Sequence, residues 1–412
     1  MRFGVFIVLA VLLISARAIA QDQTDLRTEI ESIKQQLAQM DELKTRLAAL
    51  EKKLEDSERA KEKPLAVSAG YPYDKVKLDG RMFVGLFATG TQGPARYWTT
   101  DIPDAKFRMT FIPSERTTFV ARLSANNTTV TGFDYFYLDY ASVPVPGSTL
   151  RLGQRKVEVG LETLTDNPEE SILVTNSAPH VSGYATGVSL FGPLTRSACS
   201  PSLAVGFVNG PKGVMVRPTN GLPFNARLSS PIPGNLYAAA SWYDSGTLDR
   251  EDASAVSVAE IITAPPGAVK WRRTLWNYDL RYGYGPTGVR PMIPMKEPPK
   301  LMIGASVGAF QDTSTGAPDR DGAFWYAEGL ARLSSRAYLA ARYSRVKLDD
   351  RILARLDDSP VPVNSYARTS IGLGYLISEL TQLKTEYAFN NASGGLTQPS
   401  LNLWSLGVAS KF

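Results

Sequence analysis

The sequence has very few of the side chains on which catalytic and metal sites depend. Its 412 residues include one cysteine, Cys199, and one histidine, His180. A single cysteine excludes an internal disulfide, and no Cys/His cluster is present that could hold a metal ion. With one histidine, in an expected loop, the chain offers no Ser/His/Asp arrangement. We therefore expect neither an enzyme nor a bound cofactor.

Long apolar runs and basic patches are also missing. Beyond the N-terminus, no segment approaches the roughly eighteen consecutive apolar residues of a transmembrane helix. Lys and Arg number 45 against 40 Asp and Glu, but no basic block is interleaved with aromatic residues, so nucleic-acid binding finds no support. Charged residues make up 21% of the chain and aromatic residues 10%, which fits a β-barrel with aromatic girdles.

The first residues predict export. Arg2 precedes an apolar run at residues 5–14, and Ala18-Ile19-Ala20 forms a small-x-small cleavage signal. This is the pattern of a secretory signal peptide, assigned to residues 1–20. The alternative, an N-terminal membrane anchor, is disfavoured because the apolar run is too short to span a bilayer.

Residues 21–60 predict a periplasmic coiled-coil stalk. Apolar residues recur there in steps of three and four, which is a heptad seam with one extra three-residue step. A helix with so narrow a stripe needs partners, either other copies of the chain in a homotrimer or a different protein or the cell wall. Residues 61–75 predict a linker. The seam consists of Leu26, Ile30, Ile33, Leu37, Met40, Leu43, Leu47, Leu50 and Leu54.

From residue 76 onward, apolar and polar residues alternate in short runs separated by turns. In residues 106–112, for example, Phe107 and Met109 fall on one face and Lys106 and Arg108 on the other. Such strands fit a soluble sandwich, or a barrel with lipid outside and water inside. An even strand count and mostly alternating short and long connections favour the barrel, so residues 76–412 predict an all-β transmembrane β-barrel of 16 antiparallel strands. We expect strands at 76–89, 106–112, 117–125, 133–142, 148–156, 185–192, 202–208, 223–229, 235–243, 272–283, 301–310, 323–333, 337–348, 367–377, 381–391 and 401–412.

The last strand, residues 401–412, predicts how the barrel closes. Its alternation places Phe412 on the apolar face, at the periplasmic membrane interface, with Ser410 where another apolar residue would be usual. We expect this strand to pair with residues 76–89 and the barrel assembly machinery to recognise Phe412. The alternative is an edge strand of a soluble sandwich.

Two connections stand out by length. Residues 157–184 form the third outer loop, which we expect to fold into the lumen and narrow it, because a sixteen-stranded barrel leaves an aqueous channel. Residues 244–271 form the other long loop. Residues 283–300 are too long and proline-rich for a simple periplasmic turn.

Several motifs resemble, in order, those of the phosphate-selective porin (O and P) family. Residues 153–162, GQRKVEVGLE, resemble its Gly-Gln-Phe-Lys-x-Pro-Phe-Gly-Leu-Glu motif. Residues 186–192, 205–210, 226–228 and 342–343 resemble its Gly-Val-x-Leu-x-Gly, Phe-x-Asn-Gly, Ala-Arg-Leu and Ala-Arg-Tyr segments. The resemblance spans most of residues 76–412. It implies a stalked trimeric porin in the outer membrane of a Gram-negative bacterium.

The departures from the family pattern limit that implication. Arg155 stands where the family has an aromatic residue and Glu158 where it has proline, and no dense lysine series is present. Phosphate specificity is therefore not expected to carry over. The leucines Leu150 and Leu152 share a face with Gln154, which predicts a β-bulge at Gly153.

Alternation predicts which charged residues face the lumen. A basic surplus there would attract anions. Alternatively, each charge pairs with an acid on a neighbouring strand and only maintains a polar wall. The inward basic candidates are Lys106, Arg108, Arg122, Arg227, Arg281, Arg332, Arg342 and Lys384, the inward acids are Asp139, Asp279, Glu328 and Glu386, and the resemblance adds Gln154 and Lys156.

The chain is thus expected to pass small hydrophilic solutes across the outer membrane by diffusion, with a preference for anions such as phosphate or dicarboxylates. Two other functions stay open. The barrel could anchor a stalk that tethers the envelope, or it could sheathe a partner such as an electron-carrying protein.

Overall fold

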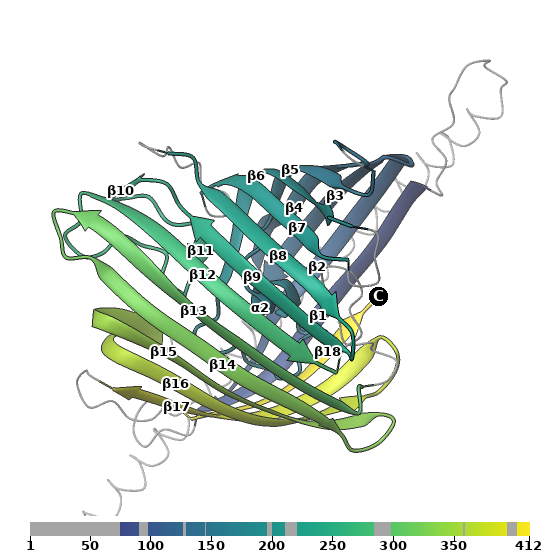
Figure 1. The fold of residues 1–412 in the computed structure, drawn as a ribbon. Helices are drawn as coiled ribbons and strands as arrows, with labels where there is room; N and C mark the ends of the chain where they lie inside the picture. The colour runs from purple at the N-terminus through teal and green to yellow at the C-terminus, as the bar shows by residue number, and fades with distance from the viewer. Residues whose placement is uncertain are drawn as a thin grey trace, which may run out of the picture. The chain divides into compact units, whose positions relative to one another are not determined.

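Sixteen long antiparallel strands form a closed barrel in the computed structural model (Figure 1), as the sequence predicts. The ring is complete because β1 pairs with both β2 and β18, and β9 pairs with β12. The two remaining strands, β10 and β11, have two residues each and are not part of the ring. The structure describes residues 75–89, 98–126, 129–144, 146–195, 200–210, 221–283, 298–356, 359–393 and 402–412.

The observed strands match all sixteen predicted ones, and several are longer than predicted. With the two short strands β10 and β11 included, the described strands are β1 (Val76–Thr89), β2 (Trp98–Ser114), β3 (Thr117–Asn126), β4 (Thr129–Ala141), β5 (Thr149–Lys156), β6 (Ser182–Pro193), β7 (Ser202–Asn209), β8 (Phe224–Ile232), β9 (Leu236–Asp244), β10 (Leu248–Asp249), β11 (Val256–Ser257), β12 (Lys270–Tyr282), β13 (Leu301–Thr315), β14 (Arg320–Arg332), β15 (Ala337–Leu356), β16 (Ser359–Leu376), β17 (Thr381–Ser393) and β18 (Leu403–Lys411).

Closure occurs between the first and last strands, as predicted. The backbone amides and carbonyls of Gly80 and Phe412 bond to each other at 2.8 and 3.0 Å. A Cβ on Gly80 would lie 2.4 Å from the Phe412 ring, so only glycine leaves room for it there. The outward Ser410, unusual on this face, bonds through its hydroxyl to Thr381 on β17 at 2.9 Å, which satisfies its polar group.

The wall alternates between an apolar outside and a polar inside. Phe107 and Phe136 are about half exposed on the outer face, whereas Arg122 and Tyr135 are buried inside. This period of two follows from the pleat of a strand. This alternation puts apolar residues on the outer face, where lipid would lie, and charged residues in the lumen.

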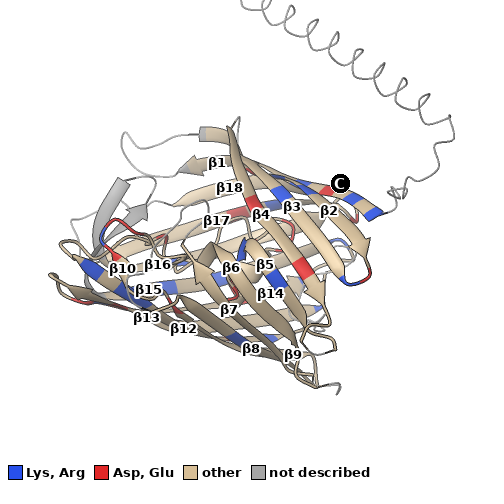
Figure 2. Ribbon diagram, turned by 90° about the horizontal axis from the view of Figure 1, so that it is seen from above, with Lys and Arg blue, Asp and Glu red and all other residues tan. Residues whose placement is uncertain are grey.

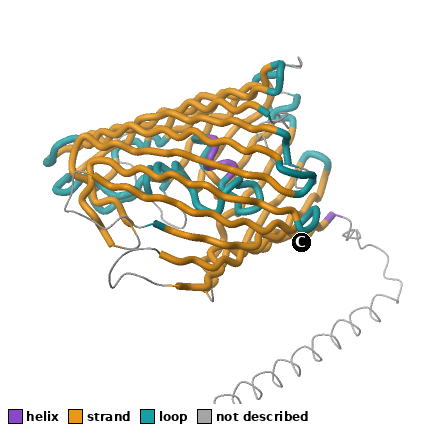
Figure 3. Tube along the Cα trace, turned by 90° about the horizontal axis from the view of Figure 1, so that it is seen from below, coloured by secondary structure: helices purple, strands orange, loops and turns teal. Residues whose placement is uncertain are grey.

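Two loops fold into the barrel (Figure 3). The first inner loop, residues 157–181, contains the short helix α2 (Leu161–Thr165), and Val157, Val159 and Leu164 within it are almost fully buried. The second inner loop, residues 245–269, contains β10 and β11, and β11 pairs with the start of β6. The sequence predicts an inward fold only for the first.

The inner loops share an apolar core with one side of the wall. Val157 and Val181 of the first loop pack with Val256 and Val258 of the second. The wall contributes inward residues to the same cluster, namely Tyr243, Leu275, Phe310, Phe324, Val346, Leu348 and Tyr366. That side of the lumen is therefore filled.

Several predictions fall outside the described residues. These are the signal peptide (residues 1–20), the stalk (21–60) with its nine seam residues, nearly all of the linker (61–75), and most of the 283–300 connection. In the part of the chain that is described, no helix is long and apolar enough to cross a membrane.

Candidate functional site

The open part of the lumen lies between the first inner loop and strands β18 to β4. A cavity of about 410 Å³ occupies it. The wall strands line it with Asp79, Arg81, Lys106, Arg108, Arg122, Tyr135 and Lys411, the first inner loop lines it with Asn167, Glu169 and Glu170, and Gly80, Leu380 and Phe412 complete it.

The basic side chains are arranged in two rows across neighbouring strands. Strand register places Lys411 opposite Arg81, and Arg81 opposite Lys106. Two residues along β2, Arg108 stands opposite Arg122 on β3. Because directly opposed residues of an antiparallel pair point to the same face, all five cations face the lumen. Figure 2 marks the Lys and Arg positions along the strands in blue.

Acids within the wall hold most of these cations in place. Asp134 accepts hydrogen bonds from Lys106 at 2.6 Å and from Arg122 at 2.8 Å. Arg122 also stacks on the Tyr135 ring, with its guanidinium carbon 3.5 Å from the ring centre. Arg81 donates to Asp104 at 2.6 Å. These charges are thus fixed in position, and their fields are partly cancelled.

Arg108 is the most exposed of the five cations that line the cavity. Its side chain is 43% exposed and pairs at 2.7 Å with Asp79, which is 41% exposed. A pair this open to water contributes little to stability. The guanidinium is consequently available to exchange one carboxylate for another.

The first inner loop presents the opposite charge to the basic rows. Glu169 lies 3.4 Å from Arg81 and 3.7 Å from Lys411, measured between charged atoms. Glu170 lines the same cavity. The cavity therefore has a field across it, from five cations on the wall to acids on the loop.

Three predicted lumen residues bind the first inner loop instead of lining the cavity. Lys384 donates to the carbonyls of Pro168 and Ser171, and Arg342 donates to that of Thr175 at 3.0 Å. Glu386 accepts from the amides of Val174 and Thr175 at 2.6 and 2.7 Å. These strands are far from the loop in sequence, so the contacts fix the loop across the lumen.

Other predicted residues form ion pairs in the wall. Arg227 bonds to Asp279 at 2.9 Å, with both side chains fully buried. Arg281 and Arg342 share Glu328. The alternative prediction, in which each inward charge pairs with an acid on a neighbouring strand and maintains a polar wall, therefore describes these residues.

Two further predicted residues also lie apart from the cavity. Asp139 pairs with Arg151 at 2.6 Å. Arg332 is half-buried at the end of β14, opposite the buried Tyr338.

Lys156, at the end of β5, belongs to a cluster at the base of the first inner loop. Its ammonium bonds to Asp166, and His180 Nε2 lies 3.8 Å from the same carboxylate. Burial opposes ionisation of Asp166, but Lys156 and His180 outweigh it and hold the pKa of Asp166 well below its usual value. Burial lowers the pKa of His180, yet Asp166, Glu162 and Glu260 raise it above its ordinary value.

Gln154 differs from its prediction. The register places it opposite the outward Phe136, and its amide donates to the carbonyl of Phe133 at 2.6 Å, so it lies on the outer face. The predicted bulge at Gly153 is absent from the β4–β5 pairing. Gln154 simply continues the alternation of Leu150 and Leu152, whereas Lys156 reaches the interior because the strand ends there and the chain turns inward.

The sequence reading missed several residues of the site. Arg81 and Lys411 alternate with apolar neighbours in the first and last strands, so the same alternation rule finds them. Asp134 has no register partner on β3, because the β3–β4 register shifts between Phe133 and Tyr135. A rule of strict alternation therefore does not identify it as an inward residue. Glu169 and Glu170 lie in the first inner loop, for which no periodic signal exists. The described residues contain no group of three His, Cys, Asp or Glu able to hold a metal ion.

Comparison of the sequence with protein-family models and with curated proteins found no match. Solved structures do match the fold. The outer membrane channel DcaP of Acinetobacter baumannii is 11% identical, with a TM-score of 0.54, and the alignment covers 82% of this chain and 97% of that one. An anion-selective porin from Comamonas acidovorans is 11% identical, with a TM-score of 0.52 and coverage of 82% and 99%.

A trimer form of OmpT, an outer membrane protein of Vibrio cholerae, is similar to the same degree. It is 9% identical, with a TM-score of 0.53 and coverage of 82% and 99%. Identities this low establish the fold alone. This chain therefore has the closed sixteen-stranded barrel fold that porins share.

Proposed function

We propose that the chain is an outer-membrane porin through which small hydrophilic solutes diffuse, with a modest preference for anions. The observation that carries this proposal is the cavity of about 410 Å³ between the basic rows and the acidic first inner loop. Its lining holds five basic and three acidic side chains, a surplus of two positive charges. Basic side chains at a constriction favour anion passage.

The preference is modest because wall acids neutralise much of the basic surplus. Asp104 and Asp134 pair with Arg81, Lys106 and Arg122. Among the cations that line the cavity, Arg108 and Lys411 have the greatest exposure, at 43% and 30% of their side chains. Phosphate and dicarboxylates suit such a site because a guanidinium binds carboxylate or phosphate in a fork. In fold, the barrel resembles both an anion-selective porin and an outer membrane channel, which supports the porin proposal.

The test is conductance in planar bilayers under a salt gradient. Wild-type protein should give open channels whose reversal potential indicates anion preference. Arg108→Glu should shift that potential toward cations. Arg345→Glu is the matched control, because Arg345 points outward from β15 and should leave selectivity unchanged. Absence of conductance, or an Arg108→Glu channel with wild-type selectivity, would contradict the proposal.

The stalk, trimer and membrane-insertion predictions complete the proposal. Residues 21–60 would join three copies in the periplasm after removal of residues 1–20, and Phe412 would be recognised by the barrel assembly machinery. Deletion of residues 21–64 should abolish trimers on native gels while single channels still conduct. Trimers that survive the deletion, with unchanged solute uptake, would assign the stalk to tethering.

Removal of Phe412 should lower the amount of inserted barrel without changing selectivity.

A further inference from the structure

The outer face of the barrel becomes basic toward the end that carries the long loops. On β15, Tyr343, Arg345 and Lys347 point outward and are exposed, alternating with the buried Ser344 and Val346. The pleat places the three outward side chains in a line along the strand, separated by about 7 Å. The line runs from an aromatic ring to two successive cations.

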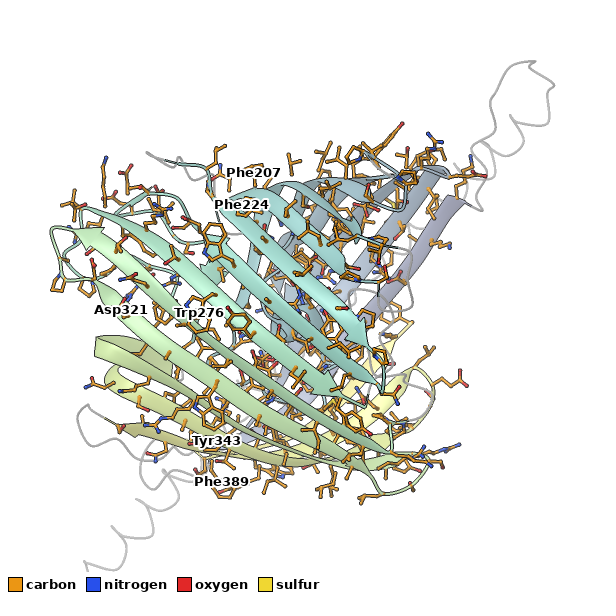
Figure 4. The ribbon with its side chains drawn as sticks, viewed as in Figure 1. Phe207, Phe224, Trp276, Asp321, Tyr343 and Phe389 are labelled. Atoms are coloured by element: carbon orange, nitrogen blue, oxygen red, sulfur yellow. The ribbon has the colours of Figure 1, made fainter. Side chains whose placement is uncertain are left out.

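An aromatic pair lies directly beside the first cation. Arg345 is opposite Trp325 on β14, and the rings of Trp325 and Tyr343 are 5.0 Å apart. Both rings are about 40% exposed, and Tyr343 and Trp276 are among the outward aromatic residues labelled in Figure 4. Trp and Tyr on the outside of a barrel mark the membrane–water interface. Arg345 and Lys347 therefore lie at the height of the lipid headgroups.

Among the residues whose side chains the structure describes, neither cation has a carboxylate partner. Arg345 donates to the Ser365 hydroxyl at 2.9 Å, and Lys347 makes no hydrogen bond or ion pair with any described residue. In the lumen, by contrast, Arg81, Lys106 and Arg122 each have a carboxylate within 3 Å. The outward acid on β14, Asp321, lies two residues beyond Ala323, which is the register partner of Lys347.

We propose that Arg345 and Lys347 bind a phosphate group of the phosphorylated glycolipid of the outer leaflet. Two adjacent cations complement the negative charge of a phosphate, and an arginine guanidinium can donate two parallel hydrogen bonds to it. A lipid, not free phosphate, fits this surface because Leu339, Ile371 and Leu373, each over 40% exposed, continue the outer face of β15 and β16 away from the cations and would contact acyl chains. The inference rests on the outer-membrane orientation in the proposed function.

The probe is bisphosphorylated lipid A, added to the full-length protein in detergent and followed by native mass spectrometry. Wild type should bind it, and Arg345→Gln/Lys347→Gln should bind at least about tenfold more weakly. The matched control is Arg272→Gln, since Arg272 also points outward but is already paired with Asp244. That variant should bind as wild type does. Heat-dependent gel mobility would show that each variant is folded.

Three outcomes would overturn the proposal. One is equal binding by the double variant and wild type. Another is equal binding of dephosphorylated lipid A by wild type, and the third is equal binding of phosphatidylglycerol, which would indicate attraction to any anionic lipid. Conductance in bilayers free of lipid A separates this inference from the porin proposal. The double variant should conduct as wild type, and a wild type that binds lipid A without conducting would contradict only the porin function.

Discussion

The two sides of the lumen use charge in different ways. On the filled side, beneath the inner loops, the buried Arg273, Arg320 and Arg342 pair with acids, and each also donates to a loop carbonyl. On the open side, the basic rows face a cavity, and the Arg108–Asp79 pair is more than 40% exposed at both ends. The same residue types thus fix the loops on one side and line the cavity on the other. The position of the inner loops, not residue identity, separates the two roles.

The Asp312 cluster is the clearest case of the first role. Asp312 bonds to Arg273 at 2.7 Å and to Arg320, with all three residues buried. Arg273 donates to the carbonyls of Val256 and Ile261, and Arg320 donates to that of Thr263 at 2.7 Å. The cluster therefore holds the second inner loop, which in turn contacts the first through the 2.5 Å bond from Ala259 to Pro179.

The largest expected effect is that of Asp312→Ala. It leaves two buried guanidinium groups without their carboxylate, so the free energy of unfolding should fall by about 3–5 kcal/mol. Urea unfolding of the barrel in micelles measures it. Single channels should also become noisier as the second inner loop loosens. Asp79→Ala, which breaks the exposed Arg108–Asp79 pair, is the control and should cost less than about 1 kcal/mol. Equal losses in the two variants would refute the distinction between the sides.

Removal of an acid on the open side should change selectivity instead of stability. Asp79→Asn frees the half-exposed Arg108, so the anion-to-cation permeability ratio should rise, by roughly twofold, while unfolding shifts by less than about 1 kcal/mol. Reversal potentials give the ratio. Asp139→Asn is matched to it, because Asp139 pairs with Arg151 away from the cavity and its loss should leave selectivity unchanged. A destabilised Asp79→Asn barrel with unaltered selectivity would contradict the assignment.

The sequence was sufficient to locate every long strand, because alternation is a local property of the pleat. It also placed Lys106, Arg108 and Arg122 on the inner face. It did not separate these from Lys384 and Glu386, whose partners lie more than 200 residues away in the first inner loop. Which inward charge lines the cavity depends on where that loop lies, and no periodic pattern encodes the path of an irregular loop. The inward fold of residues 245–269 was missed for the same reason.

The smallest expected effect concerns the base of the first inner loop, at the boundary between the two sides. The folded pKa of His180 is raised by Asp166, Glu162 and Glu260 despite burial, so protonated His180 stabilises the loop. That stabilisation is complete below the ordinary histidine pKa of about 6.5 and is lost as pH rises through the higher folded value. Current noise should therefore increase across that interval in wild type. In His180→Asn it should be insensitive to pH there, because the titrating group is gone. Current noise that rises equally in both proteins would show that the pH-sensitive group is not His180, and that its contact with Asp166 does not control the loop.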